Sequence, residues 1–556
     1  VFYPNIETWD KDLKKLPEMI ENLASFKGKL NDFETFKSFY ETQERVSQHI
    51  YRLYAYIHLA SDLNLKDQEK SSKNQEVLLM LATLNQKTSF VSPELIALGE
   101  EKVMSFCEKD AFLNTYKFQF EMLFHQQKHV LDQDQEQLLS NFQSTRSVPS
   151  SLYQGLAIVD AKDEKVTLSS GKEITVTLAN YRSLIPTLEN AEDRKRVFEA
   201  TFKRYKENKS TFAATYNLVL QQQRAYAVSR KYDSTLEAAL FRNNIPVSVF
   251  HNLKDTAFEH TAPVKRYIEL RKKYLKLDSY RTYDRFLKLA KDDTNYTYEE
   301  AKKIFISSLE GMSEDFISHQ KEAIRDGFVD AYPQDGKRSG AYSSGFYGFH
   351  PFIMLNHDDT MDALFTLAHE AGHSAHTLYS NENQPMASSN YTIFVAEIAS
   401  TFNEHLLLDY LLKKAETKEQ KIVLLESAID GIMSTFYRQT LFATYEFRAN
   451  ELVEKGVPIT EKALSDIMID LYKHYYDIDI TEEDGKQYVW AYIPHLFHTP
   501  FYVYQYATSY SASLKIYENV KNNAPKAMEN YLGLLKSGSS DYPVNQAAKA
   551  GADLTD

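Results

Sequence analysis

The sequence predicts a mostly helical fold, and three observations support this prediction. Glycine and proline, which interrupt helices, account for only 17 and 15 of the 556 residues. Apolar side chains recur at helical spacing in many segments, for example at Val77, Leu78, Met80, Leu81 and Leu84. Strand-like patterns are confined to two short segments. We therefore expect successive long helices with two small β-structures.

The first strand-like segment reads as a β-hairpin. Residues 166–168 and 174–177 are rich in β-branched side chains, and the turn between them contains Gly171. Helical patterning precedes this hairpin and resumes from about Asp193. We therefore predict a boundary here, between an N-terminal helical domain with a small hairpin over 1–185 and a second domain over 186–556.

The second strand-like segment, 335–356, reads DGKRSGAYSSGFYGFHPFIMLN and holds four of the chain's 17 glycines. Turn and strand signals alone fit a surface loop followed by a buried strand. The functional interpretation is a small sheet that lies directly before the motif helix described below.

Composition excludes several classes of protein. Lys and Arg number 64 against 77 Asp and Glu, and the net charge of −13 argues against a nucleic-acid partner. Cys107 is the single cysteine, so no intrachain disulfide can form. The chain opens without a signal-peptide pattern, and no apolar run approaches the ~18 residues that span a bilayer. We expect a cytoplasmic protein without membrane contact, as a monomer or small homo-oligomer.

The residues that indicate a metal-binding and catalytic function lie in the segment LFTLAHEAGHSAHTLYS, 364–380. His369 and His373 are four residues apart, so on a helix both imidazoles lie on one face, about 40° apart and one turn along the axis. Two imidazoles in this arrangement can bind one zinc ion. Glu370 is turned about 100° away, from where it reaches a water held by the metal without itself binding the metal. The sequence therefore predicts a zinc site with Glu370 as the catalytic base.

The flanks of the motif support a helix. Asp358, Asp359 and Thr360 are candidates for the N-terminal cap. Small residues, Gly372 among them, allow another element to approach closely. The alternative without a metal-binding function is a helix that carries two polar histidines on an exposed face.

The third zinc ligand comes from outside this motif. The extended HExxHxxGxxH pattern fails here, because its last two positions hold His376 and Tyr379. His376 lies about 10.5 Å along the axis from His369, too far to share an ion, so we expect it to be a hydrogen-bonding neighbour. On the next predicted helix, Glu397 and Glu404 lie seven residues apart on one face. We take Glu397 as the ligand and Glu404 as the carboxylate that orients a ligand histidine.

At this point the chain resembles a known family. HEAGHSAHTLYSN (369–381) followed by FVAEIASTFNEHLL (394–407) is similar to the thimet-oligopeptidase-like zinc metallopeptidases, in particular the bacterial oligoendopeptidase F branch. The segments KRSGAYSSG, PFIMLN and IPHLFHTPFYVYQYATSYSA resemble the same branch. HExxH is common, whereas the spacing to VAEIAST together with FYVYQYAT is more specific.

The resemblance implies a mostly α, two-lobed zincin-type fold with a deep substrate channel, in which 186–556 is the catalytic domain. It also implies internal cleavage of short oligopeptides, one zinc on His369, His373 and Glu397, and Glu370 as the base. The family uses a late histidine and tyrosines to hold the oxyanion. We take His495, Tyr502 and Tyr506 as the catalytic residues of this set, with His498 as an alternative. Tyr504 and Tyr510 are taken as substrate-binding, although aromatics at this density also fit a core.

The expected reaction follows from these roles. Zinc lowers the pKa of the water it binds to about 7, and Glu370 takes the proton of that water and passes it to the leaving amine. The stretch from Gly340 to Gly345, with Gly340 and Ala341 as candidate substrate-binding residues, would act as an edge strand that holds the peptide backbone. Two alternatives remain open: a helical zinc carboxypeptidase that uses the same motif, and a peptide-binding scaffold that holds no metal.

Overall fold

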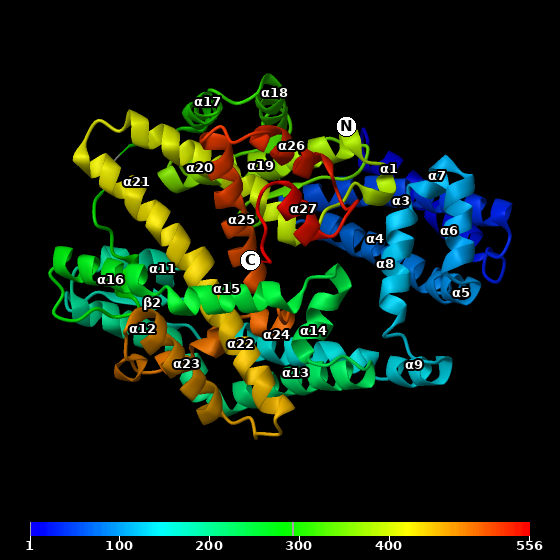
Figure 1. The fold of residues 1–556 in the computed structure, drawn as a ribbon. Coiled ribbons are helices and arrows are strands. Elements are labelled where there is room, and N and C mark those ends of the chain that lie inside the picture. The colour runs from blue at the N-terminus through cyan, green and yellow to red at the C-terminus, as the bar shows by residue number, and fades with distance from the viewer. Residues whose placement is uncertain (1, 292–293, 556) are drawn as a thin grey trace. The chain divides into compact units, whose positions relative to one another are not determined.

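The computed structural model describes residues 2–291 and 294–555, and it is mostly helical, as predicted (Figure 1). The chain forms two compact units, each built from separate stretches of sequence. The first unit contains 1–128, 293–413 and 512–553, and the second contains 129–292, 414–511 and 554–556. This division is spatial, and the domain boundary near residue 185 stays a prediction. Among the described helices, none combines the length and the apolar character needed to span a membrane.

The first unit has the following helices and strands: α1 (Ile6–Leu13), α2 (Leu16–Ala24), α3 (Phe33–Asp62), α4 (Gln68–Lys87), α5 (Val91–Leu98), α6 (Glu100–Lys109), α7 (Ala111–Asn114), α8 (Lys117–Gln127), α17 (Tyr298–Ser308), α18 (Glu314–Ala323), β3 (Val329–Asp330), β4 (Tyr342–Ser344), β5 (Phe352–Met354), α19 (Met361–Asn383), α20 (Ile393–Lys414), α26 (Ala527–Lys536) and α27 (Pro543–Lys549).

The second unit has the following: α9 (Gln133–Ser140), α10 (Val148–Gln154), β1 (Glu164–Thr167), β2 (Glu173–Val176), α11 (Tyr181–Leu184), α12 (Ala191–Glu207), α13 (Lys209–Ser229), α14 (Thr235–Leu240), α15 (Val247–Glu259), α16 (Ala262–Tyr274), α21 (Lys418–Gly431), α22 (Arg438–Glu454), α23 (Glu461–Tyr476) and α24 (His495–His498). Helix α25 (Tyr504–Lys521) begins in this unit, and its residues from Ala512 belong to the first unit.

Helix α4 is less amphipathic than its sequence pattern suggests. Val77 is its single buried residue, and Leu78, which the spacing placed in the core, is 45% exposed. Met80, Leu81 and Leu84 are partly buried against the cores around α3. The apolar positions therefore cover a narrower stripe than the periodicity predicted, because α4 packs on one side only.

The small sheet predicted before the motif helix is present. Its strand order is β3-β5-β4, with β3 parallel and β4 antiparallel to β5, and Ser343 pairs with Ile353. Strand β4 is thus at one edge of this sheet. Helix α19 begins soon afterwards, where the Thr360 side chain accepts a hydrogen bond from the backbone N–H of Ala363. This cap is one of the three that the sequence suggested.

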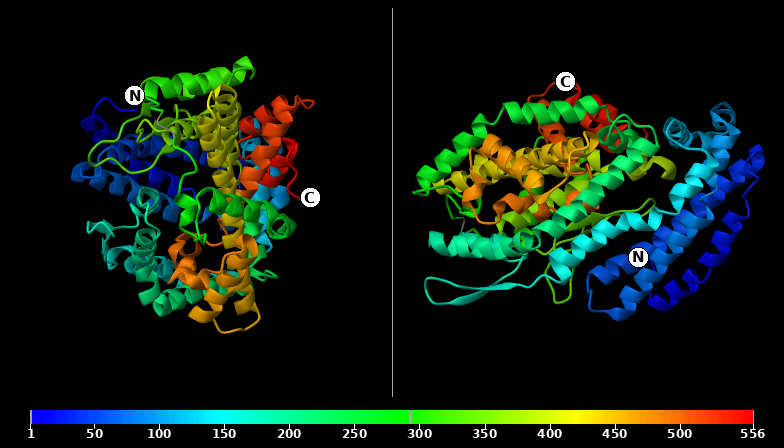
Figure 2. Two further views of the ribbon diagram at one scale, coloured as in Figure 1. Left: turned by 90° about the vertical axis from the view of Figure 1, so that its left-hand side faces the viewer. Right: turned by 90° about the horizontal axis from the view of Figure 1, so that it is seen from below.

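The predicted hairpin is also present in the second unit (Figure 2). Strands β1 and β2 are antiparallel, with Glu164 opposite Val176. Gly171 in the turn has φ +81°, a left-handed conformation that glycine adopts without strain. Helix α12 fixes the hairpin through Arg196, whose guanidinium donates to the carbonyl of Thr167 at 3.0 Å.

A buried carboxyl group holds the loop that precedes α25. Glu446 on α22 is 2% exposed and accepts a hydrogen bond from the backbone N–H of Phe501 at 2.7 Å. Phe501 has φ +53°, so this bond stabilises a backbone conformation that side chains other than glycine rarely adopt. Burial raises the pKa of Glu446 to about 8, and the Phe501 N–H lowers it by a smaller amount.

We predict that Glu446 makes stability fall as pH rises. The native state keeps this proton up to about pH 8, whereas the unfolded chain releases it near the ordinary value of 4.5, so the native state binds more protons in between. The free energy of unfolding of the wild type should decline from about pH 5 to about pH 8, relative to Glu446→Gln, by at most about 1.4 kcal/mol per pH unit. Denaturant titrations over this range measure the difference, and parallel pH profiles would contradict the prediction.

Candidate metal centre

Helix α19 presents His369 and His373 on one face, as their spacing requires. Their Nε2 atoms lie 3.2 Å apart, and both side chains are partly buried. Burial holds the pKa of His373 well below its usual range, and the neighbouring His369 lowers it further. A neutral imidazole has a free ring nitrogen, which is the form that binds a metal.

Helix α20 brings Glu397 to the same point. Its Oε2 lies 3.5 Å from Nε2 of His369 and 3.9 Å from Nε2 of His373. A tetrahedral zinc site with ligand distances of about 2.0–2.1 Å has ligand atoms roughly 3.3–3.4 Å apart. These three atoms therefore fit three corners of such a site, and the fourth corner is left for substrate or water. His369, His373 and Glu397 are also the one group of three ligand-type side chains found this close together in the described parts of the chain.

Glu404 lies behind the ligand set, where the sequence predicted it. Its Oε1 is 2.5 Å from Nδ1 of His369, so the carboxylate accepts a hydrogen bond from the Nδ1–H. The other ring nitrogen, Nε2, is then the one that faces the ligand set. Burial lowers the pKa of His369, but the contact with Glu404 outweighs it and the pKa is raised to about 9. The contact with Glu404 therefore fixes the orientation of this imidazole.

The two helices cross at Gly372. A Cβ atom added there would lie 2.6 Å from the carbonyl oxygen of Ala399 and from Cα of Ser400, so only glycine allows this approach. Asn403, which is fully buried on α20, donates to the carbonyl of Ala368 on α19 at 2.9 Å. This crossing is what places Glu397 and Glu404 beside the histidines. Its sequence signal was the run of small residues after His369.

Glu370 is 7% exposed and lies between α19 and the small sheet. Burial raises its pKa to about 7, and the neighbouring His369 lowers it by a smaller amount. Strand β4 is joined to α19 beside this residue, because the hydroxyls of Ser343 and Ser374 are 2.8 Å apart. The carboxyl group is thus held next to the edge strand and one residue from a ligand histidine.

His376 does not have the hydrogen-bonding role that the sequence suggested. Within the described structure neither of its ring nitrogens has a hydrogen-bond partner. Its ring instead stacks on Tyr391 at 3.6 Å, and burial lowers its pKa to about 3. The hydroxyl of Tyr391 is within 2.8 Å of the Thr377 hydroxyl and donates to the carbonyl of His373 at 3.3 Å. Sequence reasoning missed Tyr391 because its contacts are tertiary.

The predicted oxyanion residues belong to the second unit. The rings of His495 and Tyr502 are stacked with centroids 5.8 Å apart, and Tyr506 lies 6.0 Å from His495 and 5.4 Å from Tyr502. These three form one cluster at the start of α25. The alternative, His498, is bound through Nδ1 to the hydroxyl of Ser150.

The predicted substrate-binding residues differ in exposure. Tyr504 is 2% exposed and packs edge-on against Phe250, as a core residue does, which gives no support to a binding role. Tyr510 is 9% exposed. Gly340, in contrast, is exposed and Ala341 half-buried, immediately before the edge strand β4. The carbonyl of Gly340 accepts a hydrogen bond from the Asn356 amide at 2.7 Å.

Comparison with known proteins identifies the family of this chain. Residues 185–556 match the model of peptidase family M3, and residues 94–162 match the oligopeptidase F model. The chain belongs to peptidase family M3. It is therefore a metallopeptidase, which removes the metal-free scaffold as an alternative.

Relatives of this peptidase are similar to it along all or nearly all of this chain. The chain is 36% identical over 559 residues to oligopeptidase PepF of Bacillus subtilis, covering all of this chain and 82% of that protein. It is 33% identical to group B oligopeptidase PepB of Streptococcus agalactiae, covering 99% and 91%. Among solved structures, oligoendopeptidase F of Enterococcus faecium is 28% identical with a TM-score of 0.77, covering 99% and 95%. A peptidase structure from Chlamydophila abortus is 32% identical with a TM-score of 0.89, covering 100% and 93%.

We predict that Gly372→Ala damages the metal centre. The added methyl group has to push α20 away from α19, so the variant should lose about 1–3 kcal/mol of stability and bind metal more weakly. Thermal denaturation and metal titration measure both effects. Gly533→Ala on α26 is the matched control, because nothing lies within 4 Å of its added Cβ, and it should leave metal binding unchanged. Equal behaviour of the two variants would show that the crossing at Gly372 does not set the ligand geometry.

Proposed function

We propose that this metallopeptidase is a zinc endopeptidase that hydrolyses internal bonds of short oligopeptides. The observation that supports it most directly is the convergence of His369, His373 and Glu397 with an open fourth position and Glu370 beside it. One zinc per chain fits this set of two imidazoles and one carboxylate. Short peptides are proposed as substrates because the relatives are named oligopeptidases.

Zinc bound there would act as a Lewis acid and would lower the pKa of a water in the open position to about 7. The chain's own residues supply the proton transfers and the positioning. Glu370 accepts the proton of the attacking water on its carboxylate and delivers it to the nitrogen of the leaving amine. Glu404 keeps the Nδ1 proton of His369 in place, so the imidazole presents Nε2 throughout the reaction.

Two groups of residues are proposed to handle the substrate. The outer edge of β4, with Gly340 and Ala341 before it, is not paired with another described strand and would pair with the extended backbone of a peptide. His495, Tyr502 and Tyr506 are the proposed donors to the oxyanion that develops on the scissile carbonyl. A folded protein has its backbone already paired, so the pairing with β4 favours short unstructured peptides.

One experiment tests the reaction and its rival together. Purified protein is assayed for metal content and then incubated with a mixed peptide library, and the products are mapped by mass spectrometry. We expect about one zinc per chain and cleavage inside the peptides. Release of single C-terminal residues would instead support the carboxypeptidase alternative, and an active preparation without zinc would contradict the proposed metal.

We predict that Glu370→Gln abolishes turnover while zinc stays bound. The amide keeps the shape of the side chain but does not accept a proton, so kcat should fall by at least about 10²–10⁴-fold. The matched control is Glu382→Gln, which lies on the same helix and pairs with His319 at the surface. Near-normal rates for Glu370→Gln would show that another group is the base.

The two glutamates of α20 should differ in their effect on zinc. Glu397→Ala removes a ligand and should weaken zinc binding sharply, whereas Glu404→Ala removes the partner of one ligand and should cost about 10–100-fold. Competition with a chelator of known affinity measures both variants under the same conditions. The opposite ranking would mean that the roles of the two carboxylates are exchanged.

A further inference from the structure

A cluster of cations lies inside the second unit, apart from the residues assigned so far. It consists of Arg438 and Lys486, which both contact the side chain of Tyr472, and of Arg285, whose charge also acts on that side chain. We call these three residues the cationic cluster. Tyr472 is 3% exposed. Burial by itself raises the pKa of this phenol, yet Lys486, Arg438 and Arg285 together bring it below its usual value. The three positive charges therefore all act on the buried phenol of Tyr472.

Lys486 is the most enclosed member of the cationic cluster. It is 6% exposed, and its Nζ lies over the rings of Phe202, Tyr472 and Phe198, at 5.0, 5.3 and 5.8 Å from their centroids. The ammonium forms no ion pair and no hydrogen bond with any residue that the structure describes. Aromatic faces stabilise a single cation. They do not cancel its repulsion of the two neighbouring guanidinium groups, and burial lowers the pKa of Lys486 accordingly.

The two arginines also have no carboxylate partner in the described ranges. Arg438 donates to the Tyr472 hydroxyl at 3.4 Å and lies 4.7 Å from the ring of Phe442. Arg285 lies 4.5 Å from the ring of Phe286. Burial and the nearby Arg438 lower the pKa of Arg285 to about 10. Arg285 and Arg438 are half-buried and Lys486 is buried. Cations withdrawn from water in proteins are normally paired, so this arrangement has an excess of positive charge.

Three carboxylates in this part of the second unit form hydrogen bonds or ion pairs with residues outside the cationic cluster. Glu483 accepts the backbone N–H of Thr282 at 2.8 Å and its hydroxyl at 2.5 Å. Asp284 pairs with Arg194 at 3.1 Å, and Glu426 pairs with Arg271 at 2.8 Å. Asp284 and Glu426 are therefore paired with other cations, and Glu483, whose hydrogen-bond donors are neutral, is the one of these acids whose charge acts on Lys486. One carboxylate thus stands against three cations, and the cationic cluster keeps an excess of positive charge.

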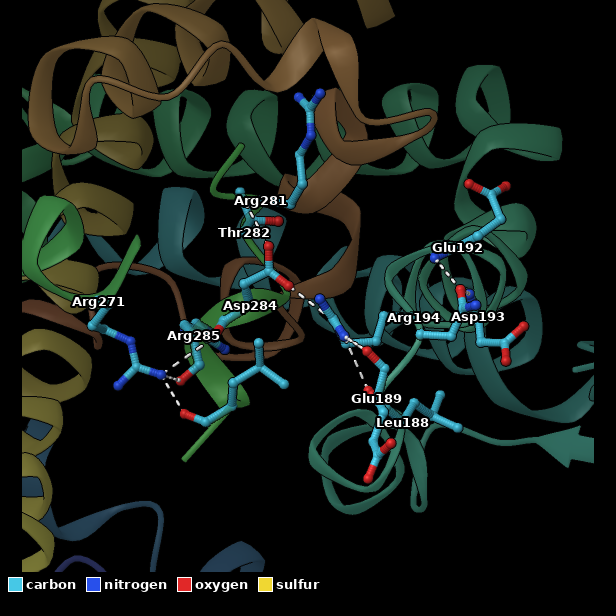
Figure 3. Close-up of polar contacts among 12 residues, drawn as sticks. Leu188, Glu189, Glu192, Asp193, Arg194, Arg271, Arg281, Thr282, Asp284 and Arg285 are labelled. Atoms are coloured by element: carbon cyan, nitrogen blue, oxygen red, sulfur yellow. Dashed lines mark hydrogen bonds and ion pairs between the residues drawn. The ribbon is translucent and has the colours of Figure 1, made fainter. Parts of the chain in front are cut away.

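The backbone around Arg285 is held rigidly, as Figure 3 shows. The Arg271 guanidinium donates to the carbonyls of Asp284 and Arg285 at 3.3 and 3.2 Å, and also to that of Leu287. From the other side Arg194 binds the Asp284 carboxylate. Moving this turn to separate the charges would therefore break several hydrogen bonds. A bound anion would offset the charges and leave these hydrogen bonds in place.

We propose that Arg285, Arg438, Lys486 and the hydroxyl of Tyr472 form a binding site for a small inorganic anion. The N–H and O–H donors of these residues suit a halide or a phosphate, which accept hydrogen bonds without a fixed orientation. The aromatic rings around Lys486 exclude water and so strengthen the attraction. The bound anion stabilises the second unit by offsetting the repulsion among the three cations.

The test is the thermal stability of the zinc-loaded protein at constant ionic strength. Gluconate is replaced stepwise by chloride in one series and by phosphate in another. The denaturation midpoint should rise with a saturating dependence, by about 2–4 °C, in at least one series. The series in which it rises identifies the anion. A midpoint that does not respond to either anion would overturn the proposal and leave the Tyr472 phenolate as the counter-ion.

The variant Lys486→Met tests whether the anion that raises the denaturation midpoint binds at the cationic cluster. Methionine suits the aromatic pocket and removes one of the repelling charges, so this variant should be at least as stable as the wild type in gluconate and should lose the response to anions. The matched control is Lys462→Met, an exposed lysine paired with Asp466 on α23, which should keep the response. Arg438→Gln serves the same purpose if Lys486→Met does not fold. An unchanged response in the variant of the cationic cluster would place the anion elsewhere, for instance at the zinc, and would overturn the proposal.

Discussion

The close crossing of α19 and α20 at Gly372 is the constraint on which the metal centre depends. It brings two glutamates that lie seven residues apart on α20 against two histidines that lie four apart on α19. Neither helix holds three ligands by itself. The buried amide of Asn403 satisfies a carbonyl of α19 at this crossing, so the approach costs no hydrogen bond. A glycine inside the motif is therefore as necessary to the site as the residues that bind the metal.

Charge explains why this arrangement favours a dication. Glu370, Glu397 and Glu404 lie around two imidazoles in a region that is partly closed to water. Without a cation the carboxylates repel one another. Glu404 is the main cause of the raised pKa of His369, and Glu397 adds to the effect of burial in raising the pKa of Glu370. A divalent cation bound there would relieve this repulsion and link the two helices, so metal binding would be coupled to the stability of this unit. In the second unit the cationic cluster has the opposite imbalance, an excess of positive charge.

Much of the fold and of the site could be predicted from local sequence. The hairpin, the small sheet and the cap of α19 depend on neighbouring residues, and the positions of His369, Glu370 and His373 follow from helix geometry alone. Contacts between segments could not be predicted in the same way. The stacking of His376 on Tyr391, the exposure of Leu78 and the burial of Tyr504 are set by which helix packs where. The cationic cluster joins residues 285, 438, 472 and 486, and no spacing in the sequence indicates it.

The proposed function depends on one zinc ion held by His369, His373 and Glu397. Anomalous diffraction measured on either side of the zinc absorption edge, from crystals of the purified protein, tests it most directly. We expect a single strong peak within about 2.0–2.2 Å of Nε2 of both histidines and of the nearer oxygen of Glu397. A peak bound by other residues, or no peak in crystals of active protein, would contradict the account.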